Sequence, residues 1–212
     1  MIEQIVSRKR VVDHGEVFTG PREVNAMLDL VRSETERIDS RFLEPACGTG
    51  NFLAEVLERK LKVVDARYRT SQVEHERYTL LAVSSLYGID LLGDNVTECR
   101  RRLRTIVESH GGAPMSGPFL HSINFVLERN IIRGDALSLK TVGESPRPIV
   151  FSEWSLVNGS MVKRRDFEFH ELLSFAGMKE KPLFSDLGEE AFFPEPVREF
   201  PPTHYLGLAD AD

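Results

Sequence analysis

The sequence predicts an α/β fold in which a doubly wound parallel sheet is covered by helices. Short apolar segments that suit strands alternate with amphipathic segments that suit helices, and this alternation implies parallel strands joined by right-handed crossovers. Three of the predicted strands end in a carboxylate, at Glu44, Asp90 and Asp135. A glycine-bracketed turn follows the first of them. We therefore expect a ligand site at the carboxyl edge of the sheet.

The composition indicates one globular domain, with or without an appendage. A length of 212 residues suits this size, and no apolar run approaches the roughly 20 residues of a membrane span. The first ten residues lack the apolar stretch of a secretory signal, and two cysteines are too few for a disulfide framework or a metal cluster. We expect a cytoplasmic protein that contacts no membrane and holds no metal.

The net charge of −6 gives no indication of nucleic-acid binding. Basic residues nevertheless gather at residues 8–10, 100–104 and 163–165. A solvated face explains each cluster more simply than a phosphate-binding surface does. If the protein contacts DNA, the second and third clusters are the ones that we expect to do so.

The first half of the chain predicts three helices and two strands. Pro21 suits a first helical turn, and apolar residues recur on one face after it. Ser71 followed by Glu74 forms a capping-box pattern. The predicted elements are a helix at 21–38, a strand at 42–44, a helix at 51–64, a helix at 71–85 and a strand at 86–90.

The second half predicts two helices, two strands and a hairpin. Asp94 is a candidate cap for a helix, and Asn158-Gly159 between two strand-forming runs is a strong hairpin signal because both turn residues of that type take positive φ. The acidic, proline-rich C-terminal stretch favours extended chain over packed sheet. The predicted elements are a helix at 94–106, a helix at 119–128, a strand at 130–135, a fourth strand from 148, and hairpin arms at 149–157 and 160–169.

The turn after the first strand suits close approach of a polar small molecule. Glycine permits left-handed torsions and carries no side chain to block a ligand. The helix that begins at Asn51 offers unpaired backbone N–H groups to a carboxylate. A dinucleotide-binding fingerprint fits less well, because Leu53 stands at its third glycine position and Asp90 comes about 40 residues after the turn, whereas that fingerprint expects an acid roughly 20 residues on.

Four segments resemble motifs of the S-adenosylmethionine (SAM)-dependent adenine-N6 DNA methyltransferases, including the modification subunits of restriction systems. Residues 42–53, FLEPACGTGNFL, resemble motif I, and residues 15–21, GEVFTGP, resemble motif X with Gly20 where a proline is usual. Residues 87–90 resemble motif II and residues 132–137 resemble motif III. The motif order matches the gamma arrangement. The resemblance implies a Rossmann-like SAM-methyltransferase sheet.

The resemblance also implies a role for each matching residue. Asp90 would accept both ribose hydroxyls, Asp135 would take the adenine amine, and Leu91 would pack on the adenine face. Phe18 and Thr19 would close the pocket from the motif X side. The full set implied to bind SAM is Phe18, Thr19, Glu44, Pro45, Ala46, Gly48, Gly50, Asn51, Phe52, Asp90, Leu91, Asp135 and Ala136.

The string that catalyses adenine methylation in this family has no counterpart here. Its pattern is Asp or Asn, then Pro-Pro, then Tyr or Phe, and the only Pro-Pro pair, Pro201-Pro202, does not match. Glu153 and Trp154 stand near the corresponding position, where an amine acceptor and a stacking ring would act, but packing within the hairpin explains them more simply. No catalytic residue is assigned.

These features predict a SAM-methyltransferase-like domain at residues 1–175, with the motif X helix region at 1–40, and an acidic tail at 176–212. Few residues remain for further strands, so we expect a truncated sheet of strand order 3-2-1-4. The main hypothesis is a SAM-binding subunit of a DNA adenine-N6 methyltransferase of the restriction-modification or phage-defence type, with a protein partner supplying the catalytic loop and DNA recognition. The alternatives are a catalytically inactive SAM sensor or interaction subunit, and a methyltransferase for small molecules or proteins.

Overall fold

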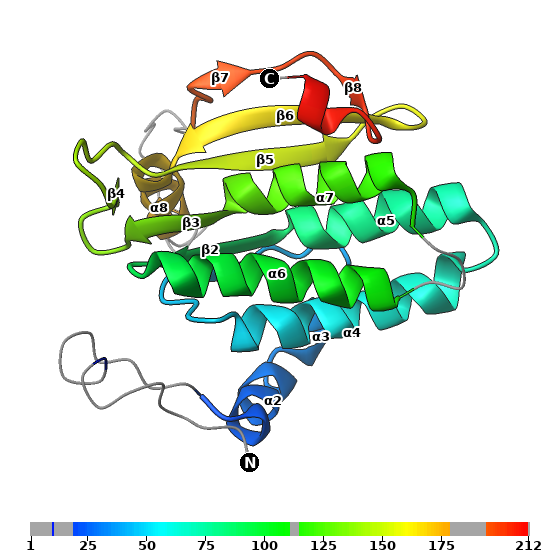
Figure 1. The fold of residues 1–212 in the computed structure, drawn as a ribbon, viewed down its shortest axis with the longest axis horizontal. Coiled ribbons are helices and arrows are strands. Elements are labelled where there is room, and N and C mark those ends of the chain that lie inside the picture. Colours follow the sequence, from blue (N-terminus) through cyan, green and yellow to red (C-terminus); the bar gives the residue numbers. More distant parts are fainter. Residues whose placement is uncertain (1–9, 11–18, 111–114, 179–193, 212) are drawn as a thin grey trace, which may run out of the picture.

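The structure, a computed structural model, describes residue 10 and residues 19–110, 115–178 and 194–211. Within these residues the chain forms seven α-helices and two four-stranded sheets, which confirms the α/β class (Figure 1). None of the helices in these ranges has the length and apolar character needed to cross a membrane. The first sheet is mixed and carries the predicted parallel strands.

The first sheet has the order β1-β2-β3-β4. Strands β1 (Phe42–Glu44), β2 (Leu86–Asp90) and β3 (Ile131–Asp135) are parallel, with β2 in the middle, so the predicted neighbours 3-2-1 are confirmed. Strand β4 (Lys140–Thr141) runs antiparallel to β3 and was not predicted. Side chains alternate along β2 and are buried on both faces of the sheet.

Four long helices pack against one face of the parallel strands. They are α4 (Asn51–Tyr68), α5 (Gln72–Ser84), α6 (Gly93–Ser109) and α7 (Gly117–Asn130). The Ser71 side chain accepts from the Glu74 N–H, as the capping pattern predicts. Asp94 does not cap α6: it lies in the first turn after an N-cap at Leu92. Ser116 caps α7, so this helix begins earlier than predicted and takes Pro118 into its first turn.

The N-terminal helix is shorter than predicted. It divides into α2 (Pro21–Asp29) and α3 (Arg32–Thr35). Val31 leaves helical geometry, with φ −121° and ψ 35°. The last buried residue of α2 is Leu28. The chain changes direction at the break, and Thr35 and Ile38 after it are buried again.

The second sheet contains the predicted hairpin. Strands β5 (Val150–Leu156) and β6 (Met161–Glu168) pair from Val150↔Glu168 to Leu156↔Val162, which confirms the hairpin. Among the turn residues only Gly159 has positive φ, at 58°, so the expectation that Asn158 shares this conformation is wrong. The turn spans residues 158–160, and a bond from the Val157 N–H to the Met161 carbonyl closes it.

The predicted fourth position of the sheet order 3-2-1-4 is wrong, because β5 does not pair with β1. Only about fourteen residues separate the end of β3 from β5, and no helix lies between them to carry the chain across the sheet. The Ile149 N–H bonds to the Leu139 carbonyl, so β5 starts at the carboxyl end of β3 and returns in the opposite direction (Figure 1). The three-residue β1, which is followed directly by Pro45, offers little edge for a ladder.

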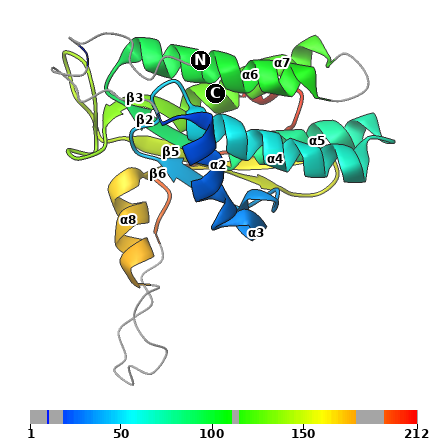
Figure 2. The ribbon, with the colours of Figure 1, turned by 90° about the horizontal axis from the view of Figure 1, so that it is seen from below.

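The C-terminal stretch is not extended throughout, which corrects the predicted tail. Helix α8 (Phe169–Met178) follows β6 and projects from the body of the fold (Figure 2). Strands β7 (Arg198–Glu199) and β8 (Thr203–His204) then pair with β6. The 3-10 helix η1 (Leu208–Asp210) packs near α7. From residue 194 onward, short strand pairings and buried aromatic rings give the chain regular structure despite its acidic, proline-rich composition.

Two apolar clusters hold the layers together. The larger one lies between the helices and one face of the parallel sheet, and includes Leu53, Leu86 and Phe119. The smaller one covers the opposite face, where Tyr87 and Ile89 of β2 meet Ile149, Phe151 and Phe169. The Tyr87 and Phe151 rings meet edge to face, with centroids 5.2 Å apart.

Candidate functional site

A cavity of about 470 Å³ lies at the carboxyl ends of β1, β2 and β3. This volume falls within the usual range for small-molecule sites. Phe18 lies outside the described residues, and Gly50 does not line the cavity; the other residues proposed from the sequence do. They are Thr19, Glu44, Pro45, Ala46, Gly48, Asn51, Phe52, Asp90, Leu91, Asp135 and Ala136.

Further lining residues were not singled out from the sequence. Leu92 and Asn95 belong to the start of α6, directly after Asp90, and Gly134 and Leu137 flank the Asp135-Ala136 pair. Their position in the sequence could have identified them, because residues next to the end of a strand lie at the same edge of the sheet. Cys47, inside the glycine turn, also lines the cavity, and its interaction with the Cys99 thiol, followed by burial, raises its pKa.

The glycine turn has the conformation that its sequence predicts. Gly48 and Gly50 have φ of 52° and 85°, which glycine adopts without strain. The turn is fixed to the sheet by the Cys47 N–H, which donates to the Ile89 carbonyl at 2.8 Å. Gly50, the last residue of the turn, packs against Cys99. It affects the conformation of the backbone and does not form part of the cavity wall.

Asp90 is the carboxylate most closely integrated into the site. Its Oδ2 accepts from the Gly48 N–H at 2.9 Å, and its Oδ1 accepts from the Leu92 N–H at 2.8 Å. The Asn95 side-chain amide donates to the same Oδ1 at 3.2 Å. A carboxylate offers about four acceptor positions, so Asp90 can accept about one more hydrogen bond as it stands. Two ligand hydroxyls would require the Asn95 amide to move away.

The other two carboxylates have different surroundings. Burial raises the pKa of Glu44, although a hydrogen bond from the Ala46 backbone partly offsets this. Hydrogen bonds from the Ser138 side chain and the Leu137 N–H lower the pKa of Asp135, which is partly buried. The three acids line one cavity but are not in register, because Glu44 pairs with Gly88 and Asp90 pairs with Arg133.

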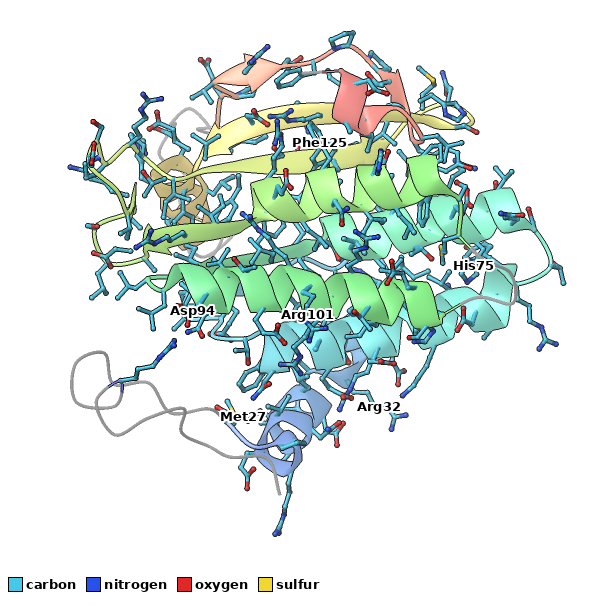
Figure 3. The ribbon with its side chains drawn as sticks, viewed as in Figure 1. Met27, Arg32, His75, Asp94, Arg101 and Phe125 are labelled. Atoms are coloured by element: carbon cyan, nitrogen blue, oxygen red, sulfur yellow. The ribbon has the colours of Figure 1, made fainter. Side chains whose placement is uncertain are left out.

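The basic cluster on α6 is engaged within the protein. The Arg100 guanidinium donates to the carbonyls of Glu128 and Ile131, where α7 ends and β3 begins. Arg102 donates to the Thr49 carbonyl in the glycine turn at 2.8 Å. Both therefore have structural partners, which weakens the expectation that this cluster contacts phosphates. Arg101 pairs with Glu98 on the same helix, and Figure 3 shows it together with Asp94 along α6.

The other clusters also have acidic partners. Arg8 and Lys9 lie outside the described residues, and Arg10 pairs with Asp94 at 2.5 Å. On the hairpin, three basic side chains meet three carboxylates. The pairs are Lys163–Glu199, Arg164–Asp166 and Arg165–Glu153. A phosphate would have to displace these partners or bind beside them.

Glu153 and Trp154 have packing roles, as the simpler sequence interpretation predicts. Glu153 forms ion pairs with Arg41 and Arg165. Trp154 is buried, and its ring meets Phe125 of α7 edge to face at 6.0 Å. Neither residue lines the cavity.

In the described part of the chain, no group of three or more His, Cys, Asp or Glu side chains could hold a metal ion. Comparison of the chain with protein-family models, with curated proteins and with solved structures finds no match.

Proposed function

We propose that this chain binds SAM in the cavity and forms the cofactor-binding half of a DNA adenine-N6 methyltransferase. In this proposal the parallel strands are a truncated Rossmann-like methyltransferase sheet. The observation that carries it is the pairing of Asp90 with the glycine turn: the strand-end carboxylate accepts a hydrogen bond from the Gly48 N–H, and both residues line the cavity. Apart from Phe18 and Gly50, the residues assigned to SAM binding from the family motifs line this one cavity.

The side chains around the cavity fit the chemistry of SAM. The carboxylates at its edge suit ribose hydroxyls, an exocyclic amine and a positively charged sulfonium. The first turn of α4, capped by Gly50 without a side-chain bond, leaves N–H groups for the carboxylate of the methionine moiety. Leu91, half-exposed at the rim, offers an apolar surface to a purine. SAM, when bound, would supply an electrophilic methyl group.

A partner protein would supply the catalytic loop and DNA recognition. The chain carries no Asn/Asp-Pro-Pro-aromatic string, and Glu153 and Trp154 are held in packing contacts. Strand β5, which occupies the corresponding place in the sequence, leads away from the cavity edge. This chain's contribution would be to bind and orient the methyl donor.

A second candidate function is a catalytically inactive SAM sensor or interaction subunit. The same direction of β5 favours it, because the described part of the chain brings no amine-accepting group of the family type to the cavity. The two functions differ in one assay. Methyl transfer to adenine-containing DNA in the presence of the genomic neighbour's product supports the first, and SAM binding without transfer under any pairing supports the second.

SAM binding itself is tested by isothermal titration with SAM and S-adenosylhomocysteine. Asp90→Asn is expected to weaken binding about tenfold or more, because hydrogen bonds to a charged group contribute roughly 1.5–3 kcal/mol. Asp94→Asn is the matched control: it removes a carboxylate four residues away that does not line the cavity, and is expected to leave affinity unchanged. Absence of binding by the parent chain would refute the proposal.

A further inference from the structure

Arg102 does not line the cavity. It extends from α6 toward the beginning of α4. Its Nη1 donates to the Thr49 carbonyl at 2.8 Å and to the Asn51 side-chain oxygen at 2.7 Å. The Thr49 hydroxyl is 3.3 Å from the same nitrogen. One guanidinium nitrogen therefore joins the glycine turn to the first residue of α4.

Asn51 extends this network to a third segment of the chain. Its Nδ2 donates to the Thr19 carbonyl at 2.9 Å, just before α2 begins. Asn51 and Thr19 both line the cavity. The network thus connects α6, the glycine turn and the segment before α2, and two of its members contribute to the cavity wall.

The turn requires external support because its own sequence provides little. Two of its residues are glycines at positive φ, and glycine has the largest conformational freedom in the absence of constraints. The Gly50 N-cap gives α4 no side-chain capping bond. A charge-assisted hydrogen bond to the Thr49 carbonyl compensates for this, since such bonds are about twice as strong as neutral ones. A turn held in one conformation binds a ligand without a further ordering cost.

We propose that Arg102 is the positioning residue of the cavity, which holds the glycine turn and, through Asn51, the Thr19 segment in the geometry that binds the ligand. The choice of SAM as the ligand rests on the proposed function. The ordering of the turn by Arg102 does not, so it can be measured without any ligand.

Hydrogen exchange of the free protein tests the ordering. Arg102→Met removes the donors and retains a long apolar side chain. Exchange of the amides at residues 48–53 is expected to accelerate on the order of tenfold, because a hydrogen bond with a charged donor is lost. Arg101→Met removes a charge from the neighbouring position, and Arg100→Met removes the bonds to Glu128 and Ile131. Both controls are expected to leave exchange of the turn unchanged.

Titration with SAM tests the effect on binding. Arg102→Met is expected to weaken affinity about tenfold or more, while Arg100→Met lowers the melting temperature and keeps the parental affinity. Arg102→Lys keeps the charge and one donor group, and should give exchange and affinity between those of the parent and of the Met variant. A purely structural role of Arg102 would instead lower stability and leave the affinity of the folded protein unchanged.

Each outcome has a distinct meaning. Parental exchange and parental affinity in Arg102→Met overturn the inference. If that variant does not fold, Arg102→Lys decides: parental values in both measurements overturn the inference, and losses in both support it. A parent chain that binds no SAM overturns the proposed function, and the exchange measurement then decides the role of Arg102 alone.

Discussion

Gly50 occupies a position where both the backbone and the packing exclude a side chain. Its φ of 85° is in the left-handed region, and a Cβ at this position would approach the Cys99 sulfur to 2.6 Å. The Cys99 side chain is fully buried, so it has little room to move. Gly159 also has positive φ, at 58°, but a Cβ there would meet no atom within 4 Å.

Gly50→Ala is therefore expected to destabilise the protein more than Gly159→Ala. The left-handed conformation costs alanine roughly 1–2 kcal/mol at either position. Overpacking adds about 1–3 kcal/mol at Gly50 alone. Urea unfolding of the two variants measures the difference in the free energy of unfolding. Equal losses would contradict the packing argument.

Lys60 is a buried cation outside the candidate site. Its Nζ donates to the Ile38 and Ser40 carbonyls and to the Ser85 hydroxyl. Burial lowers the pKa of Lys60 to about 7 from its ordinary value of 10.5. Between these two values the unfolded chain binds more protons than the folded one, so this group makes stability rise as the pH increases.

Lys60→Met is expected to remove this contribution. The free energy of unfolding of the parent should increase relative to that of the variant from about pH 7 toward pH 10.5, and the difference should be constant below pH 7. Lys62→Met, which removes an exposed charge from the same helix, is the control. Urea unfolding at several pH values gives the curves. Parallel curves for the parent and Lys60→Met would rule out the assigned pKa shift.

Residue-level chemistry was well predicted where it depends on neighbours in sequence. The positive φ of the glycine turn and the Ser71 cap follow from residue type and spacing alone. The hydrogen bonds of Asp90 to Asn95 and of Arg102 to Thr49 depend on how α6 lies on the sheet. No local pattern encodes that placement, so Asn95 and Arg102 were not predicted.

At the scale of elements, a chain of titratable side chains joins three helices. His75 of α5 contacts the Asp65 carboxylate of α4 at 2.7 Å. His110, directly after α6, contacts Asp65 at 2.6 Å and Glu58 at 3.0 Å. Burial alone would lower the pKa of His110, but its hydrogen bonds to Asp65 and Glu58 outweigh burial, so the pKa is raised above its ordinary value of 6.5.

His110→Gln is expected to destabilise the protein most at mildly acidic pH. Because the folded pKa is raised, the stabilisation by His110 is fully present below the unfolded pKa of 6.5 and is lost as the pH rises through the folded value. The parent should therefore lose its advantage over the variant between mildly acidic and alkaline pH. His121→Gln, at an exposed position of α7, is the control. Urea unfolding from pH 5 to pH 8 measures the free energy of unfolding of the parent and the variant. A difference between them that does not change with pH would show that the pairing of His110 is unimportant.

The elements themselves were predicted more reliably than their arrangement. Periodicity and caps identified α4, α5, β2 and the hairpin. The pairing of β5 with β6 was predicted correctly, but its expected place beside β1 was wrong. Its residues would suit either a parallel sheet position or a hairpin arm. The connection after β3 is too short to cross the sheet, and this determines where β5 lies.

At the scale of the whole molecule, the C-terminal segment is tied to the middle of the chain. The Tyr205 hydroxyl donates to the Glu76 carboxylate of α5 at 2.7 Å, and both residues are buried. The Tyr205 ring also meets Phe119 of α7 edge to face. The composition of this segment predicted extended chain. Composition does not show which aromatic side chains become buried against the rest of the fold.

Tyr205→Phe is expected to lower the free energy of unfolding by about 1–3 kcal/mol, because a buried carboxylate loses its hydroxyl donor and the ring is retained. A double-mutant cycle with Glu76→Gln isolates the coupling between the two side chains. Thermal and urea unfolding provide the four stabilities. A coupling energy near zero would show that the contact does not hold the segment to α5.

The Tyr205–Glu76 bond also has a consequence for the order of events during synthesis on the ribosome. The hairpin pairs residues close in sequence, so it can form soon after it emerges. The Glu76 carboxylate must wait until about 130 further residues have been made before it meets its hydroxyl donor. A nascent chain released at residue 193 would leave this carboxylate and the rings of Trp154 and Phe119 without their C-terminal cover, and chaperones and proteases recognise such exposed apolar surface.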